Sequence, residues 1–246
     1  MPSEHPSLGD NALLLNIAHV TARLLREYHQ HSVSGLETFP IQGPTLLVFN
    51  HSFASYDMML LAATVYEYCQ RIMRPLGDRM IFKTPGFSSI ATRLGAVEGS
   101  MENALPLLKS GALVAVAPGG MREALRPSSK KYQLCWEHRT GFARLSMVSG
   151  AKIVLAACPK ADDLYTLYEN WLTKTVYKNF RTPLPVSRGF GPSFVPRPIK
   201  LTHYLSPPFT PPKASTQTFE EELTQYHASL VGQMEKLMNI DSSESQ

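Results

Sequence analysis

TLLVFNHSFASYD, residues 45–57, joins a run of five β-branched and apolar residues directly to a polar stretch. The run Thr45 to Phe49 predicts a short strand buried on both faces, the kind that parallel sheets contain. Two similar runs follow, ALVAVA (residues 112–117) and KIVLAAC (residues 152–158), with helical patterns between the three. Strands that alternate with helices predict an α/β fold, with a mainly parallel sheet covered by helices.

Shorter patterns fill the chain between these strands. Helical periodicity and turn residues predict helices over residues 58–71, 88–94 and 141–149, and a strand, turn and helix over residues 95–111. Pro75 to Asp78 predicts a turn, and residues 80–83 predict a further strand.

The N-terminal segment, residues 1–35, contains ALLLNIAHVTARLLREY (residues 12–28), a helical pattern with a narrow polar stripe. Asp10 is a suitable N-cap for this amphipathic helix. Its apolar surface is wider than a surface helix needs, so the helix either packs on the rest of the protein or lies partly in a membrane interface. Residues 36–240 are expected to form the main domain, and residues 241–246 a disordered tail.

The C-terminal part of the chain has a different composition. Nine of the nineteen prolines lie between Pro183 and Pro212, which excludes a regular helix there and predicts an ordered, Pro-rich arm. PIKLTHYL, residues 198–205, is expected to supply a last strand. Residues 218–238 predict a closing amphipathic helix, capped by Thr218 with Glu221 three residues later.

Composition limits the classes of protein that the chain can belong to. Its 246 residues, 43% hydrophobic and 18% charged, fit one large globular domain or at most two small ones, and exclude a disordered or collagen-like chain. A net charge of +4 is too small to require a nucleic-acid partner. Three cysteines without C-x-x-C spacing predict a reducing, cytoplasmic setting. Neither a transmembrane span nor a secretory signal is expected, so any membrane association should be peripheral.

His51 and Asp57 stand where the first buried strand meets a helix. Open α/β sheets place their sites at the carboxyl ends of strands, so a catalytic loop is expected here. A carboxylate bonded to one imidazole nitrogen would raise the basicity of the other, which can then take a proton from an alcohol. The alternative is a structural histidine beside an N-capping aspartate. The chain has no Gly-x-Ser-x-Gly elbow, which disfavours a serine hydrolase.

VAPGGMREAL, residues 116–125, follows the second buried strand. Its two glycines allow the backbone to pass close to a ligand, and Arg122 and Glu123 then supply a cation and a carboxylate. The stretch matches neither the phosphate loop nor the dinucleotide fingerprint, and Gly-Gly after a strand is commonly only a turn. Parallel strands would nevertheless bring His51 and Arg122 to one edge of the sheet.

Together these stretches resemble the glycerolipid acyltransferase superfamily, which is PlsC-like. NHSFASYD matches its first block and APGGMREAL its third, while FKTPG with RLGAV (residues 82–97) and GFARLSMVSGAKIVLAACP (residues 141–159) match the second and fourth. Pro-Gly-Gly-x-Arg-Glu is most similar to the branch of diacylglycerol-acyltransferase-like and phytyl-ester-synthase-like proteins. The resemblance covers roughly residues 40–210.

Two blocks depart from the superfamily's usual form. Five residues instead of four separate His51 from Asp57, a spacing that the neutral-lipid branch also has. Gly-Gly-Met-Arg-Glu stands in place of Glu-Gly-Thr-Arg, which puts a phosphate-binding role for Arg122 in doubt and favours a neutral alcohol as the acceptor.

The resemblance implies acyl transfer from acyl-CoA or acyl-carrier protein to a hydroxyl of a glycerolipid or other lipid alcohol, with no cofactor, metal or covalent acyl-enzyme. His51 would be the general base and Asp57 would orient it. Arg122 and the backbone N–H groups near the two glycines would hold the carbonyl oxygen or the acceptor head group. The candidate substrate-binding residues are Asn50, Ser52, Lys83, Gly119, Gly120, Arg122 and Glu123.

Two basic stretches are candidate contacts for anions. The first contains Arg71, Arg74, Arg79, Lys83 and Arg93 against Asp78, and predicts either a contact with CoA phosphates or lipid head groups, or a solvated face. In the second, Lys130 and Lys131 beside Tyr132 and Trp136 indicate an interfacial contact or a surface loop.

The expected partners are therefore an acyl thioester donor, a lipid acceptor and a membrane surface, and the expected location is the cytoplasm at a membrane. A non-catalytic lipid-binding module on the same fold is the alternative function.

Overall fold

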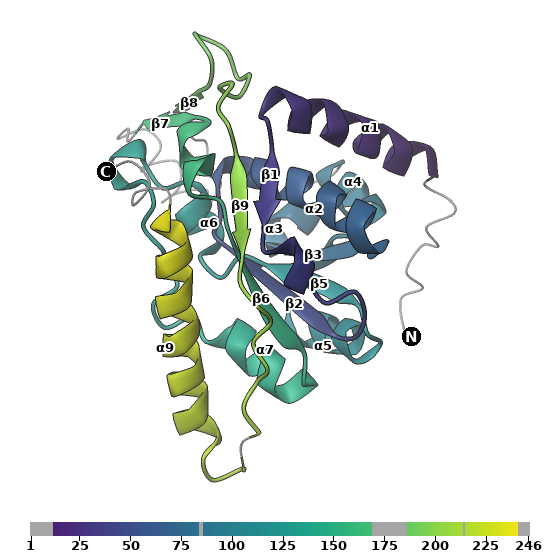
Figure 1. Ribbon diagram of the computed structural model, residues 1–246, viewed down its shortest axis with the longest axis vertical. Coiled ribbons are helices and arrows are strands. Elements are labelled where there is room, and N and C mark those ends of the chain that lie inside the picture. Colours follow the sequence, from purple (N-terminus) through teal and green to yellow (C-terminus); the bar gives the residue numbers. More distant parts are fainter. Residues whose placement is uncertain (1–11, 84–85, 169–185, 214, 241–246) are drawn as a thin grey trace.

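The computed structural model describes residues 12–83, 86–168, 186–213 and 215–240 (Figure 1). A seven-stranded sheet in the order β1-β9-β6-β2-β5-β3-β4 forms the centre of this described part. Its strands are Ser32–Ser34 (β1), Thr45–Phe49 (β2), Met73–Gly77 (β3), Val97–Glu98 (β4), Leu113–Val116 (β5), Lys152–Ala157 (β6) and Thr202–Leu205 (β9). Thr166–Tyr168 (β7) and Val186–Arg188 (β8) form a separate antiparallel pair.

The predicted mainly parallel sheet is confirmed. β6, β2, β5, β3 and β4 all run parallel to one another. β9 is antiparallel to β6, and β1 pairs in parallel with β9, so the last strands on one side run against the other five. The three buried runs of the sequence are β2, β5 and β6, which lie side by side in the middle.

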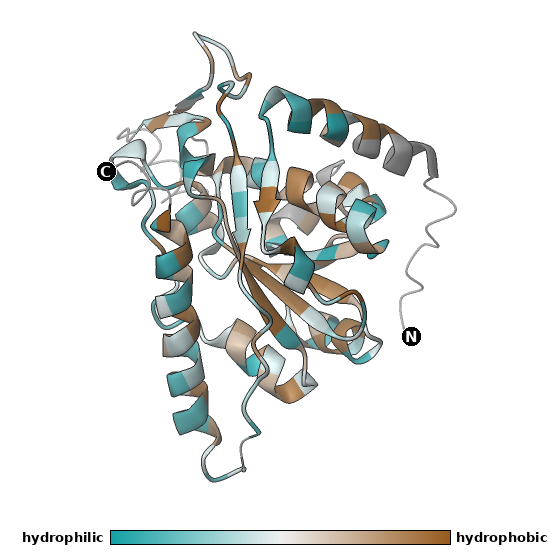
Figure 2. Ribbon diagram, viewed as in Figure 1, coloured by the Kyte–Doolittle hydropathy of each residue, from teal (hydrophilic) through white to brown (hydrophobic). Residues whose placement is uncertain are grey.

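Helices cover both faces of the sheet. They are Ala12–Tyr28 (α1), Tyr56–Cys69 (α2), Arg79–Lys83 (α3), Phe87–Arg93 (α4), Met101–Lys109 (α5), Gly120–Ala124 (α6), Gly141–Ser149 (α7) and Phe219–Met238 (α9). On one face, α5, α7 and α9 pack against alternate residues of the central strands such as Leu46 and Leu155. On the other face, α2 packs against the intervening residues, including Leu47 and Val154. Figure 2 shows the hydrophobic strands enclosed between these layers.

β2 shows why this sequence forms this sheet. All five of its residues are buried, because successive side chains point to opposite faces and both faces are covered. Burying each leucine contributes about 1.5–3 kcal/mol relative to exposure. The central strands therefore have no solvent-facing side, which explains why they read as continuous apolar runs.

Two local predictions are wrong. Residues 75–77, predicted as part of a turn, belong to β3, where Met73 to Pro75 pair with β5. Residues 80–83, predicted as a strand, lie in α3, because the carboxylate of Asp78 accepts a hydrogen bond from the N–H of Met80 and supports the start of a helix. Pro75 and Gly77 thus gave a misleading turn signal, and pairing of β3 with β5 decides the structure instead.

The predicted anion contact of the first basic stretch is wrong for Arg71. Its guanidinium donates to the carbonyl oxygens of Pro40, Gly43 and Gly111 and to the hydroxyl of Thr45. These groups lie at the N-terminal ends of β2 and β5, on the side of the sheet opposite to the carboxyl ends of these strands. Arg71 therefore holds the connections into two central strands together.

The terminal helices are placed by packing against the sheet domain. α1 lies on α2 through its buried Ala22 and through an ion pair of 2.6 Å between Arg26 and Glu67. The predicted span of α1 is confirmed, while its predicted cap, Asp10, lies outside the described residues, as do the tail and part of the Pro-rich arm. Thr218 precedes α9 but donates its hydroxyl to Glu222, so the predicted capping box with Glu221 is wrong. None of the helices in the described ranges is long and apolar enough to cross a membrane.

Candidate active site

The carboxyl ends of β2, β5 and β6 meet at one edge of the sheet. Val48 pairs with Val116 on one side and with Leu155 on the other. Continued three residues further, this register sets His51 level with Gly119 and Cys158. The two stretches singled out in the sequence, NHSFASYD and VAPGGMREAL, are therefore brought together by strand pairing.

His51 is held by one of its ring nitrogens. Nδ1 lies 2.8 Å from the backbone oxygen of Ser52 and 3.3 Å from the hydroxyl of Ser55. A carbonyl oxygen can only accept, so the proton of a neutral imidazole sits on Nδ1 and Nε2 remains available as a base. Burial lowers the pKa of His51, although the Ser52 carbonyl and the charge of Asp57 act in the opposite direction. The imidazole is therefore neutral at pH 7.

Asp57 reaches His51 through Ser52. Its carboxylate is 1% exposed, accepts a hydrogen bond from the Ser52 hydroxyl, and lies 3.3 Å from Nε2 of His203. Within the described residues no hydrogen bond joins His51 to Asp57, although one was expected. Ser52 connects them, because its carbonyl oxygen faces one residue and its hydroxyl faces the other.

The loop between these residues has an unusual backbone. Ala54 and Ser55 both have positive φ, 58° and 50°, which costs about 1–3 kcal/mol for each residue other than glycine. This left-handed pair accommodates the five residues between His51 and Asp57 in a tight turn, Phe53–Ser55, before α2 begins. Around this turn, the His51 ring bonds to the Ser52 carbonyl and the Asp57 carboxylate accepts from the Ser52 hydroxyl.

Glu123 joins the two strand-end loops. Its buried carboxylate accepts the backbone N–H of His51, and the indole N–H of Trp136 donates to it over 3.3 Å. Burial raises the pKa of Glu123 to about 7, against the opposing effect of Arg126 at 3.5 Å. Glu123 thus positions the backbone of His51 from inside the protein.

Gly119 is required by this arrangement. A β-carbon on Gly119 would lie 1.7 Å from Oε2 of Glu123, so any side chain would displace the carboxylate. Gly120 has a positive φ of 53°, and its N–H bonds to the carbonyl of Ala117 within the turn. Gly119 therefore packs against Glu123, and Gly120 closes the turn after β5.

The remaining predicted residues fall into two groups. Asn50 is buried and its side-chain oxygen accepts the N–H of Cys158 over 3.0 Å, which ties the end of β2 to the end of β6. Arg122 is exposed beside the glycine turn and makes no hydrogen bond or ion pair within the described part of the chain. Lys83 ends α3 on the surface and shares no hydrogen bond or ion pair with the strand-end residues described.

Several polar residues near the site were missed by the sequence reasoning. Arg126 is buried and bonds to Asp162 over 2.5 Å, and both line a small hollow with Phe53, Glu123 and Tyr165. No local pattern marks these residues, because their partners are distant in sequence.

Trp136 and Lys131 correct the interpretation of the second basic stretch. Trp136 is completely buried against Phe142, so its predicted interfacial contact is wrong. Lys131 pairs with Asp163 over 2.6 Å. The indole ring of Trp136 is buried inside the domain, where its N–H donates a hydrogen bond to the Glu123 carboxylate.

The strand ends of this α/β fold thus bring His51, Asp57 and Glu123 into one buried, hydrogen-bonded site. The acyltransferase family model matches residues 30–158, more than half of the chain. The chain belongs to this family.

Several individual proteins are similar in sequence to this chain. The bovine (Bos taurus) "DGAT1/2-independent enzyme synthesizing storage lipids" is 29% identical over 212 residues, 85% of this chain and 61% of that protein. Its human (Homo sapiens) counterpart is 32% identical over 182 residues, 74% of this chain and 54% of that protein. "Phytyl ester synthase 2, chloroplastic" of Arabidopsis thaliana is 32% identical over 139 residues, 54% of this chain and 20% of its own. The chain thus spans less than two thirds of these relatives.

The fold itself is matched by a solved structure. The crystal structure of PlsC, the 1-acyl-sn-glycerophosphate acyltransferase of Thermotoga maritima, superimposes with a TM-score of 0.58 over 92% of this chain and 79% of that one. The two sequences are 17% identical. The resemblance found in the sequence is therefore confirmed at the level of family and fold.

Replacement of Gly119 tests the link between the two loops. Gly119→Ala should lower the free energy of unfolding by at least about 2 kcal/mol, because the new methyl group expels a buried, hydrogen-bonded carboxylate. Gly232→Ala is the control, since its β-carbon in α9 meets nothing within 4 Å and should stabilise by up to about 1 kcal/mol. Urea denaturation measures both, and a Gly119→Ala protein as stable as the wild type would contradict this role.

Proposed function

We propose that this protein transfers a fatty acyl group from a thioester donor, acyl-CoA or acyl-carrier protein, to the hydroxyl of a glycerolipid or other lipid alcohol. The observation that carries the proposal is the orientation of His51. Nδ1 faces a carbonyl oxygen, the imidazole is neutral, and Nε2 has no hydrogen-bond partner among the described residues. A neutral imidazole with one nitrogen available is the form that a general base requires.

The proposed reaction is direct transfer. Nε2 of His51 takes the proton of the acceptor hydroxyl as its oxygen attacks the thioester carbonyl carbon. The tetrahedral intermediate then collapses, the carbon–sulfur bond breaks, and the leaving thiolate takes the proton back from the imidazolium. The products are a lipid ester and a free thiol, and no cofactor is consumed.

The other site residues have supporting roles in this proposal. Asp57 fixes Ser52, whose carbonyl fixes the His51 ring, and Glu123 fixes the backbone of His51. Arg122, exposed at the glycine turn, is positioned to meet a head group or the phosphates of the donor, whereas Lys83 would do so only from the more distant surface of α3. The names of the relatives, which concern storage lipids and phytyl esters, favour a neutral lipid acceptor.

The direct test is acyl transfer by wild-type and His51→Gln protein. With acyl-CoA and a panel of diacylglycerol, long-chain alcohol and lysophospholipid acceptors, the substitution should lower kcat by about 10²–10⁴-fold, because the general base is lost. Chromatography measures free CoA and lipid ester together. His138→Gln, at an exposed histidine, is the control and should keep wild-type activity.

Two other results would be informative. Equal activity of His51→Gln and wild type would contradict His51 as the base. If neither protein transfers an acyl group from acyl-CoA or acyl-carrier protein, but lipid co-purifies with both, the lipid-binding module is the correct function.

The same proposal includes a membrane surface as partner, reached through α1. Ile17, Val20, Leu24 and Tyr28 form one stripe along this helix and are 41–62% exposed. The opposite side of α1 is used for packing on α2. An apolar stripe on the outside of a helix that is otherwise docked is suited to lie at the boundary of head groups and acyl chains.

Leu24→Glu tests the membrane contact. Placing a charge in the stripe should weaken partitioning to phosphatidylcholine vesicles containing phosphatidylglycerol by at least about tenfold, with the melting temperature unchanged because Leu24 is 62% exposed. Thr224→Glu, which adds the same charge on an exposed part of α9, should bind as the wild type does. Vesicle flotation measures the effect. Flotation of Leu24→Glu equal to that of the wild type would contradict a membrane contact through α1.

A further inference from the structure

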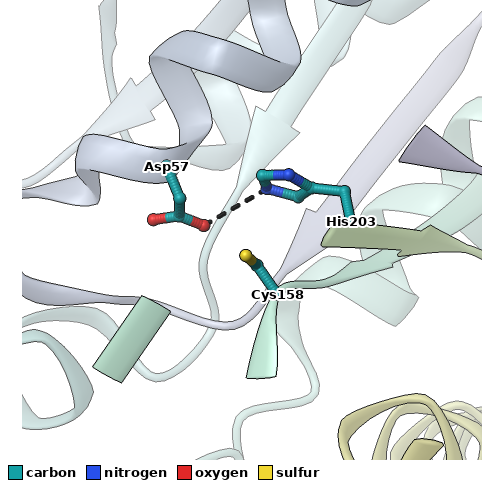
Figure 3. Close-up of side chains that lie close together, drawn as sticks. All are labelled: Asp57, Cys158 and His203. Atoms are coloured by element: carbon teal, nitrogen blue, oxygen red, sulfur yellow. Dashed lines mark ion pairs between the residues drawn. The ribbon is translucent and has the colours of Figure 1, made fainter. Parts of the chain in front are cut away.

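Asp57, Cys158 and His203 gather in the interior behind the strand-end site (Figure 3). They come from three elements: the first turn of α2, the residue after β6, and β9. Each side chain offers one ligand atom, these atoms all lie within 4.8 Å of one another, and all three residues are buried. We infer that this cluster is a binding site for a zinc ion.

The spacing of the ligand atoms fits zinc. Bonds of about 2.0–2.2 Å from zinc to nitrogen and oxygen set those two atoms about 3.3–3.5 Å apart in a tetrahedron. Nε2 of His203 and Oδ2 of Asp57 are 3.3 Å apart. The antiparallel register of β6 and β9, which pairs Ala157 with Tyr204, sets Cys158 opposite His203 when continued by one residue. Directly opposed residues project their side chains to the same face of a sheet.

One polar atom of the cluster is buried and unsatisfied. In the described part of the chain, Nε2 of His203 has no hydrogen-bond partner, since its contact with Asp57 lacks hydrogen-bond geometry. An orphaned ring nitrogen inside a protein is destabilising, because it has lost its hydrogen bonds to water without gaining a partner. Coordination of a metal ion would satisfy it, because the lone pair then points at the cation.

Two of the three ligand side chains also form the outer hydrogen bonds that are typical of metal ligands in proteins. Nδ1 of His203 lies 2.8 Å from Nε2 of His31, so the ligand histidine can donate its other proton to a neighbouring ring. The second oxygen of Asp57 accepts from the Ser52 hydroxyl. Such outer contacts hold ligating imidazoles and carboxylates in place.

Charge and ligand type select the metal. A thiolate and a carboxylate together offset the two positive charges of the ion, which makes burial of the site feasible. Sulfur and nitrogen ligands favour zinc over calcium and magnesium, which prefer oxygen alone. Sequence spacing does not reveal the cluster, because its members are separated by most of the chain. Zinc there would fasten α2, β6 and β9 together and hold Asp57 beneath the His51 loop.

Metal content and cobalt spectroscopy test the site. Protein purified from zinc-supplemented cells should contain about one zinc per chain. Exchange into Co²⁺ should produce a thiolate-to-cobalt charge-transfer band, which a site made of histidines alone does not give. Both should disappear in Cys158→Ser and remain in Cys69→Ser and Cys135→Ser, which remove the other two cysteines.

His203→Gln is the second variant and should also lose the zinc. Circular dichroism shows whether each variant is folded, and if neither is, the zinc content and the cobalt spectrum of the wild type decide the matter. A wild-type protein without zinc, a cobalt spectrum without the thiolate band, or a band that depends on Cys69 or Cys135 would overturn the inference. Because none of these readouts involves acyl transfer, their failure is distinct from failure of the proposed function.

Discussion

The parallel pairing of β2 with β5 and β6 is the constraint on which the rest of the site depends. Because Val48 pairs with Val116 and Leu155, the chain leaves all three strands at the same level. A shift of one residue in either pairing would turn alternate side chains to the wrong face and separate His51 from the glycine turn. The dense apolar packing on both faces prevents such a shift, so core packing fixes the geometry of the polar loops.

Those loops bury charged side chains, although burial of a charge usually lowers the stability of a protein. The carboxylates of Asp57 and Glu123 are both 1% exposed, and Arg126 is 7% exposed. Each has at least one charged or hydrogen-bonding partner, which offsets part of the cost of burial. Burial of this kind also keeps the His51 imidazole neutral. The same environment that costs stability thus sets the protonation state that a base needs.

Much of the fold could be predicted from the sequence, because periodicity is a local signal. The buried runs that became β2, β5 and β6, and the spans of α1 and α7, follow directly from it. Local signals failed at Pro75, where pairing with β5 decided the structure. They also could not reveal that Asp57 faces His203, since β9 reaches β6 only through tertiary folding. Residue type and position singled out the candidate site residues in the sequence, but they did not reveal the partners of those residues.

The most direct measurement is the protonation of His51, observed by long-range ¹H–¹⁵N NMR and assigned by its absence in His51→Gln. The account predicts a neutral ring at pH 7 with its proton on Nδ1, because that nitrogen faces the Ser52 carbonyl. It also predicts a pKa below 6.5, because burial disfavours the charged form. A ring that carries its proton on Nε2, or a pKa above 6.5, would contradict the role of His51 as a poised base.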